Sequence, residues 1–277
     1  MILGSLALSV LLLGGTPVSG GIKWERSFDE ALKKARASQK PIFVDFWAEW
    51  CFWCHQLEKT TYADPAVVER SEDFVAVKVN TEGGKKEEQV ALRYDVQNLP
   101  TIAFLSPGGH LVLRLNGFQG PGQFPTTMDK AREATKRIAA FETALEKNPR
   151  DAAALLGLGI HLYEQELYEE SRDLLRQAVQ NDAQEAPIHR RKGRMLLAII
   201  QTYDKKFADA ESLLKEALSL RPPGEDEPKL LFVLGRTYAS WGKVEDSQRT
   251  MQTIVRLYPQ NPLAQKARET IVALERR

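Results

Sequence analysis

Two cysteines stand close together in this sequence, and they are the only two in its 277 residues. Cys51 and Cys54 are separated by Phe52 and Trp53 and are followed by His55. Thiols at this spacing can form a small disulfide, share a metal ion, hold a haem or exchange electrons with another disulfide. The neighbouring residues and the rest of the chain help to discriminate between these four kinds of chemistry.

A purely structural disulfide and a metal site are the weaker possibilities. By the loop-entropy estimate, a bridge that closes a four-residue ring contributes about 2 kcal/mol, against about 4.7 kcal/mol for a loop of 100 residues. A structural zinc site needs about four Cys, His or acidic ligands, and no second C-x-x-C pair completes one. The histidines are scattered singly along the chain, at His55, His110, His161 and His189. We therefore expect no metal.

Haem attachment is a stronger alternative, because Cys51-x-x-Cys54-His55 satisfies the c-type attachment pattern. A bound haem also needs an apolar pocket and usually a second axial ligand. The motif directly follows a predicted buried strand, and that half of the sequence indicates no spare cavity. The haem interpretation depends on the motif alone and stays open at this point.

A redox pair explains more of the surrounding residues. The apolar and β-branched run 42–47 predicts a strand buried on both faces, and the cysteines would open the helix that follows it. Cys51 would lie at the helix N-terminus, where unpaired amides and the helix dipole stabilise a thiolate. Cys54 would lie on the same face and more deeply. One sulfur could attack and the other resolve, provided that the pair is not sealed away from solvent.

The first half of the chain, from Ile22 to about Gly120, alternates helix-like and strand-like stretches. Ser27-Phe28-Asp29-Glu30 is a capping box, which predicts a helix that ends before Pro41. The last two strands flank a Pro-Gly-Gly turn and predict a hairpin. Together with 42–47, the predicted strands are 74–79, 101–105 and 110–115. Helices that alternate with a mixed sheet indicate an α/β fold.

The second half, beyond Pro125, has helical patterns rich in Ala and Leu and contains a repeat. Ser171, Ala210 and Ser247 occupy equivalent positions that are 39 and 37 residues apart. This period fits a 34-residue helix-turn-helix unit with short insertions, in three copies over about 150–261. Small residues at these positions would let paired helices approach closely. Residues 262–277 have the pattern of a capping helix.

Both halves resemble known families. The segment 44–54 resembles the active-site strand and turn of thioredoxin, and Leu99-Pro100-Thr101 matches the element that carries its cis proline. Segments 58–65 and 116–118 are similar to the C-terminal thioredoxin-like domain of DsbD-type electron transporters. The repeats resemble tetratricopeptide repeats, an ordinary helical bundle being the alternative. We expect an α/β thioredoxin-like domain over 21–130 and an all-α tetratricopeptide solenoid over 131–277.

The thioredoxin resemblance implies roles for individual residues. Cys51 would be the attacking nucleophile, Cys54 the resolving thiol, Asp45 its proton acceptor and Pro100 the cis proline that shapes the substrate groove. A structural, paired carboxylate is the alternative role for Asp45. Supporting positions are Trp50, Phe52, Trp53, His55 and Lys78. The redox group would be the Cys51–Cys54 disulfide itself, without an organic cofactor. Thioredoxin has Gly-Pro between its cysteines and a lysine after them, so these positions leave the direction of exchange open.

The tetratricopeptide resemblance implies a concave face that binds a peptide or protein. Candidate residues on the first helix of each repeat are Ile160, Tyr163, Met195, Ile199, Tyr203, Phe232 and Arg236. Several of these side chains would serve equally well in packing between repeats.

Charge and the N-terminal residues limit the partners and the compartment. The 38 Lys and Arg nearly balance the 37 Asp and Glu, so a nucleic acid or a membrane surface finds little electrostatic attraction. The apolar run from Ile2 to Gly15 predicts a secretory signal over 1–20, although the usual leading basic residue is missing. A retained anchor, or a cytoplasmic protein without a signal, is the alternative.

These observations predict an exported thiol-disulfide oxidoreductase, most consistent with a protein-disulfide reductase. A redox partner, such as a membrane electron donor, would recycle it, and the repeats would recruit a protein. The competing hypothesis is a co-chaperone or assembly scaffold, in which the repeats carry the function and the thioredoxin-like fold serves as a platform.

Overall fold

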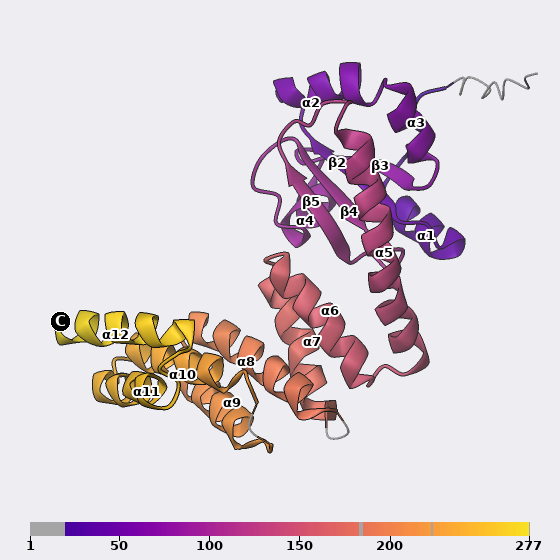
Figure 1. Cartoon of the computed structure of the whole chain (residues 1–277). Helices are drawn as coiled ribbons and strands as arrows, with labels where there is room; N and C mark the ends of the chain where they lie inside the picture. The colour runs from indigo at the N-terminus through magenta and orange to yellow at the C-terminus, as the bar shows by residue number, and fades with distance from the viewer. Residues whose placement is uncertain (1–19, 183–184, 223, 277) are drawn as a thin grey trace, which may run out of the picture.

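The structure is a computed structural model that describes residues 20–182, 185–222 and 224–276. An α/β part comes first and an all-helical part follows, which confirms the predicted fold class (Figure 1). Nearly all of the expected signal segment, residues 1–20, lies outside the described residues. Within the described ranges, no helix combines the length and the apolar character needed to cross a membrane.

The α/β part is built on a five-stranded mixed sheet with the strand order β1-β3-β2-β4-β5. Strand β2 is central, because it pairs in parallel with β3 and antiparallel with β4. Strands β4 and β5 form the predicted hairpin. Strand β1 has two residues, which is too short for a periodic pattern in the sequence. The strands are β1 (Trp24–Glu25), β2 (Ile42–Trp47), β3 (Val75–Asn80), β4 (Thr101–Leu105) and β5 (Leu111–Asn116).

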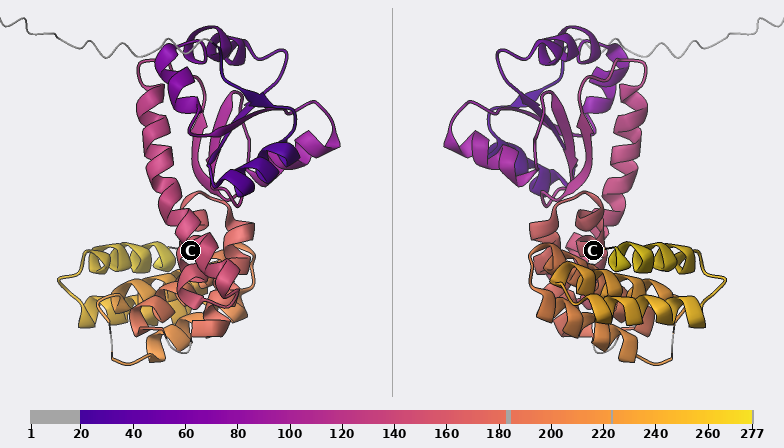
Figure 2. Two further views of the ribbon diagram at one scale, coloured as in Figure 1. Left: turned by 90° about the vertical axis from the view of Figure 1, so that its right-hand side faces the viewer. Right: turned by 90° about the vertical axis from the view of Figure 1, so that its left-hand side faces the viewer.

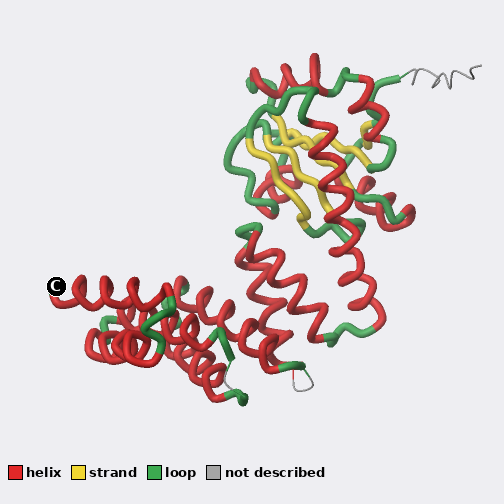
Figure 3. The backbone as a smooth tube through the Cα atoms, in the orientation of Figure 1, coloured by secondary structure: helices red, strands yellow, loops and turns green. Residues whose placement is uncertain are grey.

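Apolar side chains on the two faces of the sheet form two hydrophobic clusters. Val44 and Phe46 of β2 belong to the cluster beneath α1 and α4, and Phe43 belongs to the cluster beneath η1, α3 and α5. Figure 3 shows the strands enclosed by these helices. The Ser27 hydroxyl caps α1 by accepting from the Glu30 amide at 3.2 Å. The helices are α1 (Phe28–Ser38), α2 (Phe52–Gln56), the π-helix η1 (Leu57–Thr61), α3 (Pro65–Ser71), α4 (Lys85–Arg93) and α5 (Phe124–Lys147).

The helical part consists of paired antiparallel helices followed by a last single helix. In the first pair the Ser171 hydroxyl donates to the Gly159 carbonyl at 2.8 Å, and in the third Ser247 donates to Gly235 at 2.7 Å. Ala210 is fully buried at the equivalent place in the second pair. Small residues therefore do bring paired helices together. The helices are α6 (Ala152–Glu164), α7 (Tyr168–Asn181), α8 (Pro187–Tyr203), α9 (Phe207–Ser219), α10 (Glu227–Trp241), α11 (Val244–Leu257) and α12 (Pro262–Glu275).

The two parts share a hydrophobic core. Leu158 and Leu162 of α6 are fully buried in the same cluster as Val44 of β2 and Leu105 of β4. Helix α5 runs from the α/β part into the repeats without a break, as Figure 2 shows, so the domain boundary expected between residues 130 and 131 falls inside this helix. The first repeat is thus packed against the sheet and is not tethered by a loop alone.

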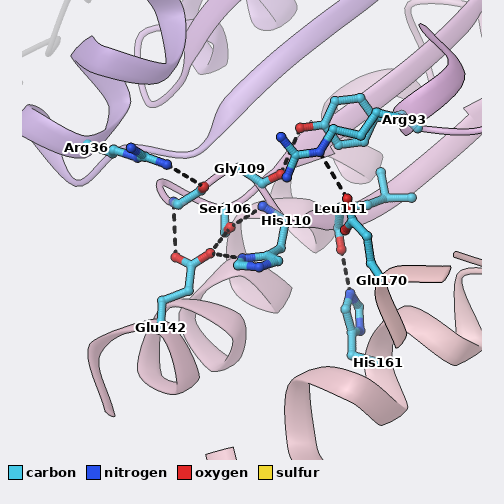
Figure 4. A network of polar contacts seen from close by, with 11 residues as sticks. Arg36, Arg93, Ser106, Gly109, His110, Leu111, Glu142, His161 and Glu170 are labelled. Carbon is cyan, nitrogen blue, oxygen red and sulfur yellow. Dashed lines mark hydrogen bonds and ion pairs between the residues drawn. The ribbon is translucent and has the colours of Figure 1, made fainter. Parts of the chain in front are cut away.

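Polar contacts reinforce this junction (Figure 4). His161 of α6 donates from Nε2 to the Leu111 carbonyl oxygen of β5 at 2.7 Å. Burial lowers the pKa of His161 from its usual value, which favours the neutral ring. The Arg93 guanidinium of α4 donates to Glu170 of α7 at 3.0 Å. Together with the shared apolar cluster, these contacts fix the first repeat against the lower end of the sheet.

Candidate active site

The two cysteines lie where the central strand β2 leads into helix α2. Their sulfurs form a disulfide, and the Cα atoms are 5.3 Å apart. Cys51 is the N-cap of α2, and its Sγ accepts from the Cys54 amide at 3.2 Å. A sulfur at this place faces the free amides of a helix start, which stabilise a thiolate when the disulfide opens. The predicted position of the pair is therefore confirmed.

Both cysteines are nearly covered in the disulfide form. Cys51 is 3% exposed and Cys54 is 4% exposed, so the expected contrast in depth is absent. The surroundings of Cys51 must therefore move before a client disulfide can contact its sulfur.

Four exposed aromatic residues, hereafter the aromatic rim, lie beside the cysteines in the sequence or pack on one of those neighbours. The Phe52 and Trp53 rings lie 5.3 Å apart, and Trp53 lies 5.3 Å from the Phe118 ring. Trp50 is 68% exposed and donates from Nε1 to the Glu82 carboxylate at 2.8 Å. The aromatic rim comprises Trp50, Phe52, Trp53 and Phe118. Their exposed apolar surface favours contact with an incoming protein.

The proline expected to shape the substrate groove precedes strand β4. The Leu99–Pro100 peptide bond is cis, and the Pro100 carbonyl accepts from the Gly117 amide at 2.8 Å. A cleft of about 280 Å³ runs between Trp50, helix α4 and Leu99. The structure thus brings the segment before Pro100 next to the aromatic rim, although they are far apart in the sequence.

Asp45 lies on β2, six residues before the first cysteine, and is 1% exposed. Burial raises the pKa of its carboxyl to about 7, although the neighbouring Lys78 and Tyr62 favour the charged form. The Oδ1 atom has no hydrogen-bond partner among the described residues. A carboxyl with a pKa near neutral pH can both take up and release a proton under ordinary conditions.

Lys78 occupies the position next to Asp45 on the neighbouring strand β3. Its Nζ donates to the Glu58 carboxylate of η1 at 2.8 Å and lies 5.2 Å from the Trp24 ring centroid. Lys78 is therefore shared between two carboxylates, and Glu58 counteracts part of its effect on Asp45. Lys78 tunes the charge of this cluster and does not neutralise Asp45 alone.

His55 lies in the last turn of α2. Its Nε2 bonds to the Glu49 carbonyl oxygen at 2.8 Å, and its ring centroid lies 6.5 Å from that of Trp47. These contacts hold the loop between β2 and α2. The structure gives His55 a place in the support of the site.

The repeats contain a groove of about 470 Å³ between α6, α8 and α10. Five of the residues predicted for it do line it: Tyr163, Ile199, Tyr203, Phe232 and Arg236. Met195 does not, because it is 5% exposed and packs into the core between the repeats. Ile160 is partly buried against the same core. Figure 1 shows that α2 lies at the end of the α/β part away from the repeats, so the groove and the disulfide are well separated.

Three residues of the site were not selected from the sequence. Phe118 belongs to a recognised motif, but only the fold brings its ring onto Trp53. Glu58 and Tyr62 follow α2 in the sequence, and their approach to Asp45 depends on how η1 packs on the sheet. No local pattern could have indicated these contacts. Among the described residues, no three His, Cys, Asp or Glu side chains gather in a way that could hold a metal ion.

Comparison with known families divides the chain in the same way as the structure. Residues 28–132 match the thioredoxin-like domain family, and residues 138–186 match the tetratricopeptide repeat family. The chain is 38% identical over 77 residues to the thiol:disulfide interchange protein DsbD of Citrobacter koseri, covering 27% of this chain and 14% of that protein. For DsbD of Actinobacillus pleuropneumoniae the identity is 33% over 113 residues, 39% of this chain and 19% of that protein. The chain thus spans less than a quarter of the length of these relatives.

Solved structures give similar partial matches. A thioredoxin from Thermus thermophilus is 29% identical, with a TM-score of 0.37, over 40% of this chain and 87% of its own. A structure described as a putative disulphide-isomerase, from Bacteroides thetaiotaomicron, is 31% identical, with a TM-score of 0.37, over 40% of this chain and 93% of its own. On the two family matches, this chain combines a thioredoxin-like domain, in which Cys51 and Cys54 form a disulfide, with a tetratricopeptide repeat region.

Proposed function

We propose that this chain is an exported protein-disulfide reductase whose repeats recruit a protein partner. The observation that carries the proposal is the Cys51–Cys54 disulfide at the start of α2, with the buried carboxyl of Asp45 on the strand that leads to it. A pair that only stabilised the fold would need neither a helix N-terminus nor a carboxyl with a pKa near 7.

The reaction begins with the reduced pair. The Cys51 thiolate attacks one sulfur of a client disulfide, the client bond breaks, a mixed disulfide forms, and the released client sulfur takes up a proton. Cys54 then gives its proton to Asp45, and its sulfur attacks Cys51 Sγ. The mixed disulfide breaks, the Cys51–Cys54 bond forms, and the second client thiol leaves with a proton. Two electrons have passed to the client, and a dithiol partner must return two to the enzyme.

Reduction of insulin disulfides, with dithiothreitol as the electron source, tests the exchange reaction. The wild-type protein should accelerate the reaction and Cys51→Ser should not. Cys54→Ser should accumulate the mixed disulfide, because the resolving thiol is missing. If neither the wild type nor the variants reduce insulin while a protein partner still binds, the scaffold hypothesis is favoured.

The direction of exchange depends on the reduction potential of the pair. A value near that of thioredoxin, about −270 mV, would support a reductase, whereas a value near about −120 mV would support an oxidant. The resemblance of segments 58–65 and 116–118 to DsbD-type electron transporters favours reduction and a membrane electron donor as the recycling partner. Equilibration of the full chain with glutathione buffers measures this potential directly.

The groove between α6, α8 and α10 is the proposed site for the recruited partner. Lys205 and Arg236 line it together with Tyr163, Tyr203 and Phe232, and none of the described residues that line it is a carboxylate. This combination favours a peptide that carries an acidic group beside an apolar side chain. An acidic peptide with one aromatic residue should bind the wild type more tightly than Arg236→Glu in fluorescence anisotropy. Arg256→Glu, on the exposed face of α11, is the matched control.

Export is proposed from the N-terminal apolar segment. An oxidising compartment would supply disulfides to reduce and would make a dedicated electron donor necessary. Fusion of residues 1–27 to alkaline phosphatase, an enzyme that needs disulfides for activity, tests the proposal. An inactive fusion that is expressed in full would contradict export.

A further inference from the structure

Two buried polar atoms next to the proposed active site lack hydrogen-bond partners among the described residues. They are Oδ1 of Asp45 and the hydroxyl oxygen of Tyr62. Both side chains are at least nine-tenths covered. Buried polar atoms of folded proteins are nearly always paired, so an unpaired acceptor and an unpaired donor in one region require an explanation.

The contacts around Tyr62 place it in the same cluster as Asp45. Its ring lies 5.6 Å from that of Phe43, which is two residues before Asp45 and therefore on the same face of β2. The Tyr62 ring centroid also lies 5.4 Å from that of Trp24, and the Lys78 Nζ lies over the same Trp24 ring. Lys78 is in turn the register neighbour of Asp45. Tyr62 and Lys78 thus approach the carboxyl from η1 and from β3.

The electrostatics agree with this geometry. The ionisable groups that face Asp45 are Lys78 of β3, Glu58 of η1 and Tyr62 directly after η1. Burial and the neighbouring Asp45 raise the pKa of Tyr62 well above its usual value, so its hydroxyl keeps the proton. Lys78 already donates to Glu58, whereas the Tyr62 hydroxyl has no acceptor among the described residues and is free to donate to the Asp45 carboxyl.

We propose that Tyr62 is a positioning residue for thiol-disulfide exchange, its hydroxyl donating a hydrogen bond to the Asp45 carboxylate and keeping it ready to accept the Cys54 proton. The inference rests on the proposed function and assigns to that reaction a residue outside the C-x-x-C motif. A phenylalanine at this position would keep the aromatic packing and remove only the donor. The charged form of Asp45 would then lose stabilisation, and the carboxyl would hold its proton to higher pH.

The test compares Tyr62→Phe with the wild type in single-turnover release of a client from the mixed disulfide, over pH 5 to 9. The midpoint of the rate should rise by about 1 pH unit, because a hydrogen bond to a charged group is lost. Near pH 6 the rate should fall about tenfold. Tyr94→Phe is the matched control, since its hydroxyl is also buried but donates to the Gly109 carbonyl at 2.8 Å, away from Asp45. The control should leave the midpoint unchanged.

A folded Tyr62→Phe protein with an unchanged midpoint overturns the proposal. If this variant does not fold, the wild-type protein labelled with ¹³C at tyrosine Cζ provides the second measurement. The Tyr62 resonance should shift with the protonation of Asp45, at a midpoint of about 7, and a resonance that stays constant from pH 5 to 9 overturns the proposal. An absence of exchange activity in the wild type would instead refute the proposed function, while the NMR titration would still report the contact.

Discussion

Replacing Asp45 with asparagine should stabilise the oxidised protein above neutral pH while slowing exchange. The carboxyl has a pKa of about 7 in the folded protein, against 3.8 without its surroundings. The folded state holds the proton more tightly than the unfolded chain. The free energy of unfolding therefore falls as the pH rises from about 3.8 to about 7, and it is not regained at higher pH. The total loss at pH 8 is about 4 kcal/mol, of which about 3 kcal/mol falls between pH 5 and pH 8.

The measurement is guanidinium unfolding of the full chain at pH 5 and pH 8, with the disulfide intact in both proteins. Tryptophan fluorescence reports mainly on the α/β part, which holds Trp24, Trp47, Trp50 and Trp53, whereas Trp241 alone lies in the repeats. The difference in unfolding free energy between Asp45→Asn and the wild type should grow by about 3 kcal/mol from pH 5 to pH 8. The cost of burying the new amide is the same at both pH values, so it cancels in the change of this difference between pH 5 and pH 8.

A difference that does not depend on pH would refute the assignment of a raised pKa to Asp45. A difference that shrinks as the pH rises would give the carboxylate the opposite role, that of a satisfied structural anion. Exchange by Asp45→Asn should in addition be slower by about 10²-fold and lose its pH dependence near 7, since the proton acceptor is gone. Retained activity with the predicted gain in stability would show that the carboxyl is buried but unused.

Three further predictions concern the junction and the aromatic rim. Leu162→Ala should lower the free energy of unfolding by about 2–5 kcal/mol and shift the fluorescence transition of the α/β part, because Leu162 is fully buried against the sheet. Leu257→Ala, at an exposed position, is the control. A transition that does not shift in Leu162→Ala would mean that the two parts unfold independently. His161 has a lowered pKa, so wild-type stability should decline as the pH falls below about 6.5, more than in His161→Gln; equal declines would contradict this. Trp53→Ala should accelerate alkylation of reduced Cys51 by iodoacetamide, because a smaller side chain exposes more of the buried cysteine. An unchanged rate would show that the aromatic rim does not limit access to Cys51.

Local sequence patterns predicted most of the elements. Strand β2 and the hairpin follow from apolar, β-branched runs, and helix α1 follows from the Ser27 cap, because these signals depend on neighbouring residues only. Helix α3 has a similar local signal at its N-terminus, where the Asp64 side chain caps the helix just before Pro65. Local signals could not locate the junction between the two parts, because it falls within α5 and a continuous helix has the same period on both sides of a domain junction.

The candidate site divides along the same line. The positions of Cys51 and Cys54 at a helix start follow from their place after a buried strand, and so does the unusual presence of Asp45 within that strand. The approach of Tyr62 to Asp45 does not, because it depends on how η1 packs on the sheet. Local sequence patterns also could not separate groove residues from core residues. Met195 and Ile199 have the same helical period, but Met195 packs into the core and Ile199 lines the groove.

By itself, the sequence determined the chemistry of this protein: a vicinal thiol pair, a carboxyl in an apolar strand and a repeated helical hairpin. Tertiary structure alone decided what those groups meet. It buried both cysteines, left the Tyr62 hydroxyl and one Asp45 oxygen covered without partners among the described residues, and packed the first repeat onto the sheet. The reason is that chemical identity and local period are properties of neighbouring residues, whereas burial and pKa depend on side chains that only folding brings together.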